Sequence, residues 1–261
     1  MFIDFDGMAV AFRVIGSGLR PRFSEAETVA LVGALWPDAF DGSAVRLESV
    51  QVGDGQVGLM LSETSFYQLL VSNLLVGLPV ESLLKVGDVT LREKALSVAA
   101  EKVAAEDVLG TPWLANALAV SVLIRDSKDD FLLVRRGSSL AVGAGLWGVS
   151  VSGGLESDDL AAENPVVNAV MREVEEELGL KVALDDVRVD GLFIGDKKLQ
   201  PIMLCTVTLD EPLGLLLPLQ GIDSELEIAN QVLVAKGDLK KYAERKRMSE
   251  AARFQITTHA K

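Results

Sequence analysis

Apolar and polar positions follow two different patterns along the chain, and the change between them divides it into two parts. Period-two alternation in the first part predicts strands at residues 8–15, 44–52 and 56–61. A helical period predicts helices at residues 24–35, 64–75 and 90–109. Ser24 and Glu27 have the spacing of a capping box, which marks the start of the first helix. We place the end of this α+β domain, residues 1–110, at Gly110-Thr111-Pro112.

Residues 111–248 contain short, continuous apolar runs that are typical of buried strands. Strands are expected at residues 117–124, 131–134, 147–151, 187–194, 202–209 and 228–234. Helices are expected at residues 165–178 and 238–247. Strands on both sides of a central helix predict an α/β sandwich. Residues 249–261 are mostly polar, and we expect a mobile tail there.

The composition indicates a folded globular protein, because 49% of the 261 residues are apolar and 24% are charged. The richest apolar stretches, residues 69–80 and 212–222, are interrupted by polar residues and fall short of the roughly 20 apolar residues that a membrane-spanning helix needs. Residues 1–6 carry two acids and no basic run, unlike a signal peptide. We therefore expect a cytoplasmic protein that does not cross a membrane.

Cys205 and His259 are the only residues of their kinds, which excludes several classes of site. A disulfide, a cysteine-rich zinc site, a Cys-His pair and a Ser-His-Asp triad all lack a partner or a base. A bound metal would need oxygen ligands, which favours Mg²⁺ or Mn²⁺. The net charge of -13 argues against nucleic acid as a partner. An anionic small molecule would have to be held by a few basic residues or by the metal.

The most informative segment is a run of acids near the end of the helix expected at residues 165–178. Glu173, Glu176 and Glu177 are three and four residues apart, so they share one helix face. Their repulsion costs roughly 0.2–0.5 kcal/mol per pair, and the negative end of the helix dipole adds to that cost. A divalent cation would turn both penalties into attraction, and Arg172 could orient Glu176 by a bidentate contact. The alternative is an ordinary solvated acidic face.

This segment resembles the signature of the Nudix hydrolases. Its second half, Arg-Glu-apolar-x-Glu-Glu-x-Gly-apolar, is matched at every specified position by residues 172–180. The resemblance implies a Nudix α/β/α sandwich, here with a smaller α+β N-terminal domain. It also implies hydrolysis of a diphosphate, with Arg172, Glu173 and Glu176 as catalytic residues. Glu173, Glu176 and Glu177 would bind Mg²⁺ or Mn²⁺.

The first half of the signature departs from the family pattern. Gly153 and Gly154 resemble the glycines that open the family's loop and are expected at the substrate site. More residues than the signature allows then separate them from Arg172, which indicates an insertion within residues 157–162. The glutamate of this half could correspond to Glu163 or to Glu156, and both alternatives stay open.

A narrower resemblance is to the Nudix branch that cleaves UDP-glucose and UDP-galactose to UMP and the sugar 1-phosphate. That branch has a longer loop within its signature, and an additional N-terminal domain with a strand, Thr-Ser-Tyr and a later Asn. Thr64-Ser65-Phe66-Tyr67 and Asn73 are similar to it. The resemblance implies that Tyr67 and Asn73 bind substrate. The alternative is that both residues only cap and pack a helix.

Four further residues are candidates for the same site. Arg135 and Arg136 end an expected strand, where they could contact a phosphate or be ordinary surface arginines. Many Nudix enzymes take a metal ligand or general base from the loop before the last strand, and this chain has Glu225 and Glu227 there. We favour Glu225 as the general base, against a solvated loop.

The sequence therefore predicts a Mg²⁺- or Mn²⁺-dependent hydrolase that acts on a nucleoside diphosphate linked to another group, with a UDP-sugar as the expected substrate. One alternative is another nucleotide, such as ADP-ribose, a dinucleotide or a damaged nucleoside triphosphate, because the signature specifies diphosphate chemistry and other loops select the base. An alternative of another class is a Nudix domain that binds a nucleotide without turning it over.

Overall fold

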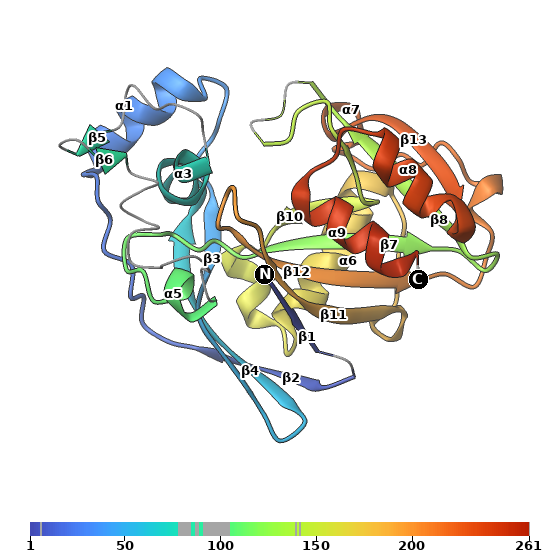
Figure 1. Ribbon diagram of the computed structural model, residues 1–261, viewed down its shortest axis with the longest axis horizontal. Helices are drawn as coiled ribbons and strands as arrows, with labels where there is room; N and C mark the ends of the chain where they lie inside the picture. Colours follow the sequence, from blue (N-terminus) through green and yellow to red (C-terminus); the bar gives the residue numbers. More distant parts are fainter. Residues whose placement is uncertain are drawn as a thin grey trace. The chain divides into compact units, whose positions relative to one another are not determined.

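A computed structural model describes residues 1–5, 7–77, 85–86, 89–90, 105–138, 140 and 142–260. The chain forms two compact units (Figure 1). The first unit contains Met1–Leu118, Gly154–Asn164 and Leu192–Pro201, and the second contains Ala119–Gly153, Pro165–Gly191 and Ile202–Lys261. Three separate stretches of chain therefore form the first unit. The boundary expected at residue 110 implies instead one continuous N-terminal stretch.

The first unit is built around a three-stranded sheet in the order β2-β4-β3. Its strands are β2 (Ala9–Val14), β3 (Ser43–Gly53) and β4 (Gln56–Ser65). β3 and β4 are the predicted antiparallel hairpin, and Asp54 and Gly55 turn the chain at φ values of 52° and 73°. β1 (Phe2–Asp4) lies beside the end of β11 (Val187–Ile194), where the amide of Ile194 donates to the carbonyl of Met1 at 3.0 Å.

The first helix of this unit, α1 (Glu25–Leu35), begins as predicted at a capping box. The Ser24 hydroxyl accepts from the Glu27 amide, and the Glu27 carboxylate accepts from the Ser24 amide at 2.8 Å. The helix expected at residues 64–75 begins later, because Ser65 rather than Thr64 caps it. It runs through α2 (Phe66–Leu69), the π-helical turn η1 (Leu70–Leu74) and α3 (Leu75–Gly77).

The helix expected at residues 90–109 falls largely on residues outside the described part of the chain. Its described end is α5 (Ala105–Leu109), and its expected first residue belongs to β6 (Val89–Thr90), which pairs with β5 (Lys85–Val86). The loop of the signature forms the 3₁₀ helix η2 (Ser157–Ala161), so the residues of the expected insertion are helical.

The second unit is an α/β sandwich around a sheet with the order β11-β12-β7-β8-β13. Its strands beyond β11 are β7 (Ala119–Arg125), β8 (Asp130–Arg136), β9 (Trp147–Gly148), β10 (Val151–Gly154), β12 (Pro201–Thr208) and β13 (Ile228–Ala235). β10 pairs with β7 and β9 with β8. β12 runs parallel to β7, whereas β13 is antiparallel to β8 and places Ile228 beside Arg136.

Helices cover both faces of this sheet: α8 (Leu239–Arg245) and α9 (Glu250–His259) lie in front of it in Figure 1, and α6 (Pro165–Leu178) lies behind. The chain also forms α7 (Ser224–Glu227) and the 3₁₀ turns η3 (Leu184–Asp186), η4 (Leu213–Leu215) and η5 (Lys236–Asp238). The bounds of α6 and β11 agree with the sequence prediction. Among the described helices, none has the length and apolar character of a membrane span.

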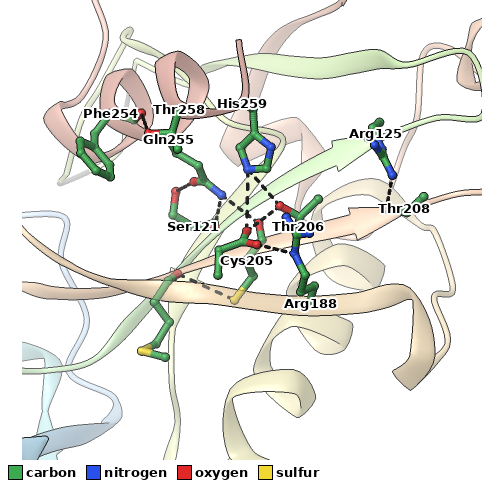
Figure 2. A network of polar contacts seen from close by, with 12 residues as sticks. Ser121, Arg125, Arg188, Cys205, Thr206, Thr208, Phe254, Gln255, Thr258 and His259 are labelled. Carbon is green, nitrogen blue, oxygen red and sulfur yellow. Dashed lines mark hydrogen bonds and ion pairs between the residues drawn. The ribbon is translucent and has the colours of Figure 1, made fainter. Parts of the chain in front are cut away.

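The prediction of a mobile tail at residues 249–261 is wrong. Ser249 caps α9, and Ala252 and Ile256 are buried in the core with Leu123 of β7 and Phe131 of β8. On the same helix, Gln255 accepts from the Ser121 hydroxyl at 2.8 Å and donates to the carbonyl of Cys205 at 2.8 Å (Figure 2). The polar composition misled the prediction because these polar side chains make buried hydrogen bonds.

Candidate active site

The predicted glutamates lie on the side of α6 that turns toward the protein interior. Glu177 is 3% exposed, and the Glu173 side chain is 13% and that of Glu176 33% exposed. One Arg172 nitrogen, Nη1, contacts Oε1 of Glu173 and Oε2 of Glu176, each at 3.0 Å. Arg172 thus bridges two carboxylates instead of making the predicted bidentate contact with one.

β10 lies directly against the carboxylates of Glu173 and Glu177. The amide of Ser152 donates to Oε1 of Glu177 at 3.2 Å. A Cβ on Gly153 would lie 1.9 Å from Oε1 of Glu173, so a side chain there would displace this carboxylate from its present position. The structure therefore gives Gly153, predicted to be at the site, a physical reason for being glycine.

A fourth acid, Glu227, belongs to the same cluster. It is the last residue of α7, directly before β13, and its Oε2 lies 3.4 Å from Nη2 of Arg136. Its charge raises the pKa of both Glu173 and Glu177. The cluster consequently holds more acid than the two neighbouring guanidinium groups can neutralise.

Three acids of the cluster, Glu173, Glu177 and Glu227, have raised pKa values. The pKa of Glu173 is raised to about 7, mainly by burial; Arg172 opposes this rise, and the charges of Glu176 and Glu227 contribute to it. The pKa of Glu177 is raised well above its ordinary value, first by burial and then by the charges of Glu227 and Glu173. Burial also raises the pKa of Glu227. These three carboxylates are thus short of positive charge, as is common at functional sites.

These acids form a donor set that fits a hard divalent cation. Carboxylate oxygens are the ligands that Mg²⁺ and Mn²⁺ prefer, and such a cation would supply the positive charge that the raised pKa values indicate. The space above Gly153 is already shaped around the Glu173 carboxylate. Within the described ranges, no three Asp, Glu, His or Cys side chains form a group ready to hold an ion, so the carboxylates would have to converge when it binds.

Other predicted site residues lie elsewhere. Glu225 is exposed, and the acid that joins the cluster is Glu227, two residues further on. Arg135 is also exposed, with its Nε 3.4 Å from the carbonyl of Gly145. Gly154 is the exposed last residue of β10, at the boundary between the two units. Glu156 and Glu163 are both exposed residues of the first unit, so the structure does not single out either as the missing glutamate of the signature.

The two residues expected to bind substrate from the N-terminal part differ in their surroundings. Tyr67 lines a pocket of about 400 Å³ in the first unit, together with Phe23 and Gln68, and its hydroxyl donates to the carbonyl of Ala39 at 3.0 Å. Asn73 is completely buried.

The amide of Asn73 is engaged on both sides. Its nitrogen donates to Asn116 at 3.1 Å and to the carbonyl of Leu199 at 2.9 Å, and its oxygen accepts from the Asn116 amide at 2.8 Å. These contacts assign Asn73 a structural role inside the first unit. We leave it out of the substrate site.

The sequence offered Glu227 beside Glu225, but Glu225 was favoured, and Ser152 was not predicted at all. A signal for Glu227 was present, because this residue directly precedes the predicted strand at residues 228–234, and a residue at a strand end is held more firmly than one in a loop. No signal pointed to Ser152, which contributes its backbone amide. A backbone donor can come from almost any residue type.

A comparison with models of known protein families gives a match to part of the chain. The family model described as NUDIX domain matches residues 115–244. No curated protein matches the chain. A Deinococcus radiodurans crystal structure is similar at 17% identity and a TM-score of 0.43, covering 56% of this chain and 85% of that one.

Two further solved structures are similar at comparable levels. The MutT protein of Methanosarcina mazei has 20% identity and a TM-score of 0.38, over 54% of this chain and 91% of its own. A bifunctional NMN adenylyltransferase/ADP ribose pyrophosphatase from Francisella tularensis has 20% identity and a TM-score of 0.41, over 64% of this chain and 44% of its own. The family assignment rests on the family model and on the glutamates of α6. Through residues 115–244, the chain belongs to the Nudix family.

Proposed function

We propose that the chain is a metal-dependent hydrolase that cleaves the diphosphate of a nucleoside diphosphate linked to another group. The observation that carries the proposal is the cluster of Glu173, Glu177 and Glu227, whose pKa values are all raised. Burying unbalanced acids costs stability, and a cation with an anionic substrate gives this arrangement a use.

Each residue of the cluster has a role in this reaction. Nudix hydrolases generally use Mg²⁺ or Mn²⁺, and Glu173, Glu176 and Glu177 would hold the ion. When bound, the ion would supply a more acidic water and positive charge against the diphosphate. Glu227, whose carboxyl pKa is raised by burial, would face the same ion and accept the proton of that water in place of Glu225. Arg172 keeps Glu173 and Glu176 in place.

We further propose a UDP-sugar as the preferred substrate. The support is the resemblance of Thr64-Ser65-Phe66-Tyr67 to the UDP-sugar branch, and the longer signature loop that forms η2. Asn73 no longer contributes to this argument because its amide is used inside the first unit. A hydrolysis screen with Mg²⁺ over UDP-glucose, UDP-galactose, ADP-ribose and nucleoside triphosphates tests both proposals. A preference for ADP-ribose would reject the uridine assignment and leave the diphosphate chemistry in place.

The competing function is nucleotide binding without turnover. The observation that favours it is the incomplete first half of the signature, since Glu156 and Glu163 are both exposed and belong to the first unit. Isothermal titration decides between the two functions. Heat of binding for a nucleotide, without any Mg²⁺- or Mn²⁺-dependent hydrolysis in the same preparation, would establish the binding module.

A further inference from the structure

Arg136 connects three separate segments of the second unit with one guanidinium group. Its Nη1 donates to the Ser152 hydroxyl at 2.7 Å, and its Nε donates to the carbonyl of Val142 at 3.3 Å. Its Nη2 lies 3.4 Å from Oε2 of Glu227. Arg136 therefore ties β10 and the loop after β8 to the acid that precedes β13.

The next residue, Gly137, holds the backbone of the same acid. Its amide donates to the carbonyl of Glu227 at 2.8 Å. A Cβ at Gly137 would lie 2.2 Å from the carbonyl oxygen of Leu226, so this approach of two backbones is possible only for glycine. Residues 136 and 137 thus hold the side chain and the backbone of Glu227, respectively.

The other contact of Arg136 reaches the buried end of the cluster. The Ser152 hydroxyl accepts a hydrogen bond from the Arg136 guanidinium, and the Ser152 backbone amide donates to Glu177. Arg136 is also the cation that opposes the raised pKa of Glu177 and of Glu227. Acids on two different elements, α6 and α7, are consequently linked through one arginine.

We propose that Arg136 is a positioning residue for the cation site: it holds Glu227 and, through Ser152, Glu177 within reach of one divalent ion. The inference deepens the proposed function and rests on it. It replaces the expectation that Arg136 binds a substrate phosphate, because three of its nitrogens already have protein partners. Lysine has a single nitrogen and cannot bridge these partners, although it keeps the charge.

The test is the affinity of the full chain for Mn²⁺ without nucleotide, measured by electron paramagnetic resonance of the free ion. Arg136→Lys should raise the Kd for Mn²⁺ about tenfold or more, as loss of a group that orients metal ligands does elsewhere. Gly137→Ala should raise it as well, because it displaces the Glu227 backbone. Arg135→Lys on the same strand is the matched control, and its Kd should stay unchanged since Arg135 is exposed.

A double-mutant cycle shows whether Arg136 acts through Glu227. In a Glu227→Gln background, Arg136→Lys should have a much smaller effect on the Kd than in the unaltered chain. With Mn²⁺ saturating, Arg136→Lys should lower kcat and leave the KM for the nucleotide nearly unchanged.

The outcomes separate this inference from the proposed function. A Kd for Mn²⁺ that Arg136→Lys leaves unchanged, a raised KM with unaltered Mn²⁺ affinity, or fully additive effects with Glu227→Gln would each overturn the positioning role alone. An unaltered chain that binds no Mn²⁺ would overturn the proposed function and the inference together. If Arg136→Lys fails to fold, Ser152→Ala tests the same linkage and should also raise the Kd.

Discussion

Glu177 is 3% exposed, and burial together with the charges of Glu227 and Glu173 raises the pKa of its carboxyl group. A buried carboxylate is tolerated when a partner offsets the cost of removing it from water. The Ser152 amide and Arg136 do this only in part, since the pKa remains raised. The same residue should therefore reduce stability without a cation and be required for turnover with one.

Replacing this acid by its neutral isostere separates the two effects. Glu177→Gln should lower turnover by orders of magnitude, as should Glu176→Gln, because each removes a proposed metal ligand. The fold of Glu177→Gln should be intact or slightly more stable in EDTA, which thermal unfolding measures. Glu175→Gln is the control: Glu175 is 56% exposed in the ion pair with Lys181, so its loss should change little. Near-normal activity of Glu176→Gln or Glu177→Gln would contradict the assignment of these residues as metal ligands.

The pH dependence of stability follows from the raised pKa of Glu173. Its pKa is about 7 in the folded protein and 4.5 ordinarily, so the folded state binds more protons between these values. The stability associated with this group is present below pH 4.5 and is lost as the pH rises through about 7. Glu173→Gln removes this dependence. Its Tm in EDTA, relative to the unaltered chain, should be higher at about pH 8 than at about pH 5.

Mg²⁺ provides the internal check on that interpretation. The ion favours the charged carboxylates, so it should raise the Tm of the unaltered chain most at the alkaline end. A Tm difference between Glu173→Gln and the unaltered chain that does not vary with pH would show that the carboxyl of Glu173 is not perturbed.

The glycine beneath Glu173 permits a test that leaves every acid in place. In Gly153→Ala the added methyl group would overlap the Glu173 carboxylate, which is the end of a flexible side chain and can move away. We expect roughly a hundredfold loss of turnover with little loss of stability, because a small misplacement of a reacting group is costly. Gly148→Ala is the matched control, since nothing lies within 4 Å of its added Cβ. Steady-state kinetics of both variants measure the difference.

At the scale of elements, the end of α6 is held by the segment that leads into α7. The amides of Gly221 and Asp223 donate to the carbonyls of Glu177 and Glu176 at 3.3 and 3.0 Å. These bonds satisfy carbonyls that a helix end leaves without intrahelical partners. The same segment continues directly into Glu227, so the capping of one acidic element also places the other.

The last helix is the element whose importance sequence composition hides. Gln255→Leu would leave the Ser121 hydroxyl and the carbonyl of Cys205 without this buried partner (Figure 2), at a cost of about 1–3 kcal/mol. Thr258→Ala removes an exposed hydroxyl from the same helix and should change stability by less than about 0.5 kcal/mol. Urea unfolding of both variants tests this. Equal urea midpoints for the two variants would contradict the structural role assigned to α9.

At the scale of the whole molecule, the first unit is assembled from three stretches of chain. The carbonyl of Leu155 accepts from the Val45 amide at 3.0 Å, and the carbonyl of Leu199 accepts from Asn73. Both acceptors belong to stretches that interrupt the second unit in sequence. The two units are therefore not independent segments of the chain, even though each is compact.

Removing residues 1–118 should consequently abolish or broaden activity rather than leave it unchanged. The remaining chain would still carry Gly154–Asn164 and Leu192–Pro201, stripped of the unit to which they belong. Apolar side chains such as Leu155 and Leu199, 0% and 2% exposed in the intact chain, would lose their packing partners. A truncated chain that unfolds cooperatively and keeps its substrate preference would refute this expectation; calorimetry and the substrate screen measure both.

Local features of the fold were predictable because short-range interactions determine them. The capping box of Ser24 and Glu27, the β3–β4 turn and the bounds of α6 all depend on residues that are close in sequence. The spacing of Glu173, Glu176 and Glu177 belongs to this class, because helical periodicity alone places them together. The family and its acidic helix could therefore be recognised before any tertiary structure was known.

Tertiary structure decided which other residues lie at the candidate site. Glu227 rather than Glu225 joins the acids of α6 because β13 pairs with β8 and brings Glu227 to Arg136, which is 91 positions earlier in the chain. The burial of Asn73 and the packing of α9 likewise depend on partners far away in sequence. Composition and spacing describe a residue's neighbours along the chain. The neighbours that determine its charge state and its role are set by strand pairing and by packing of the core.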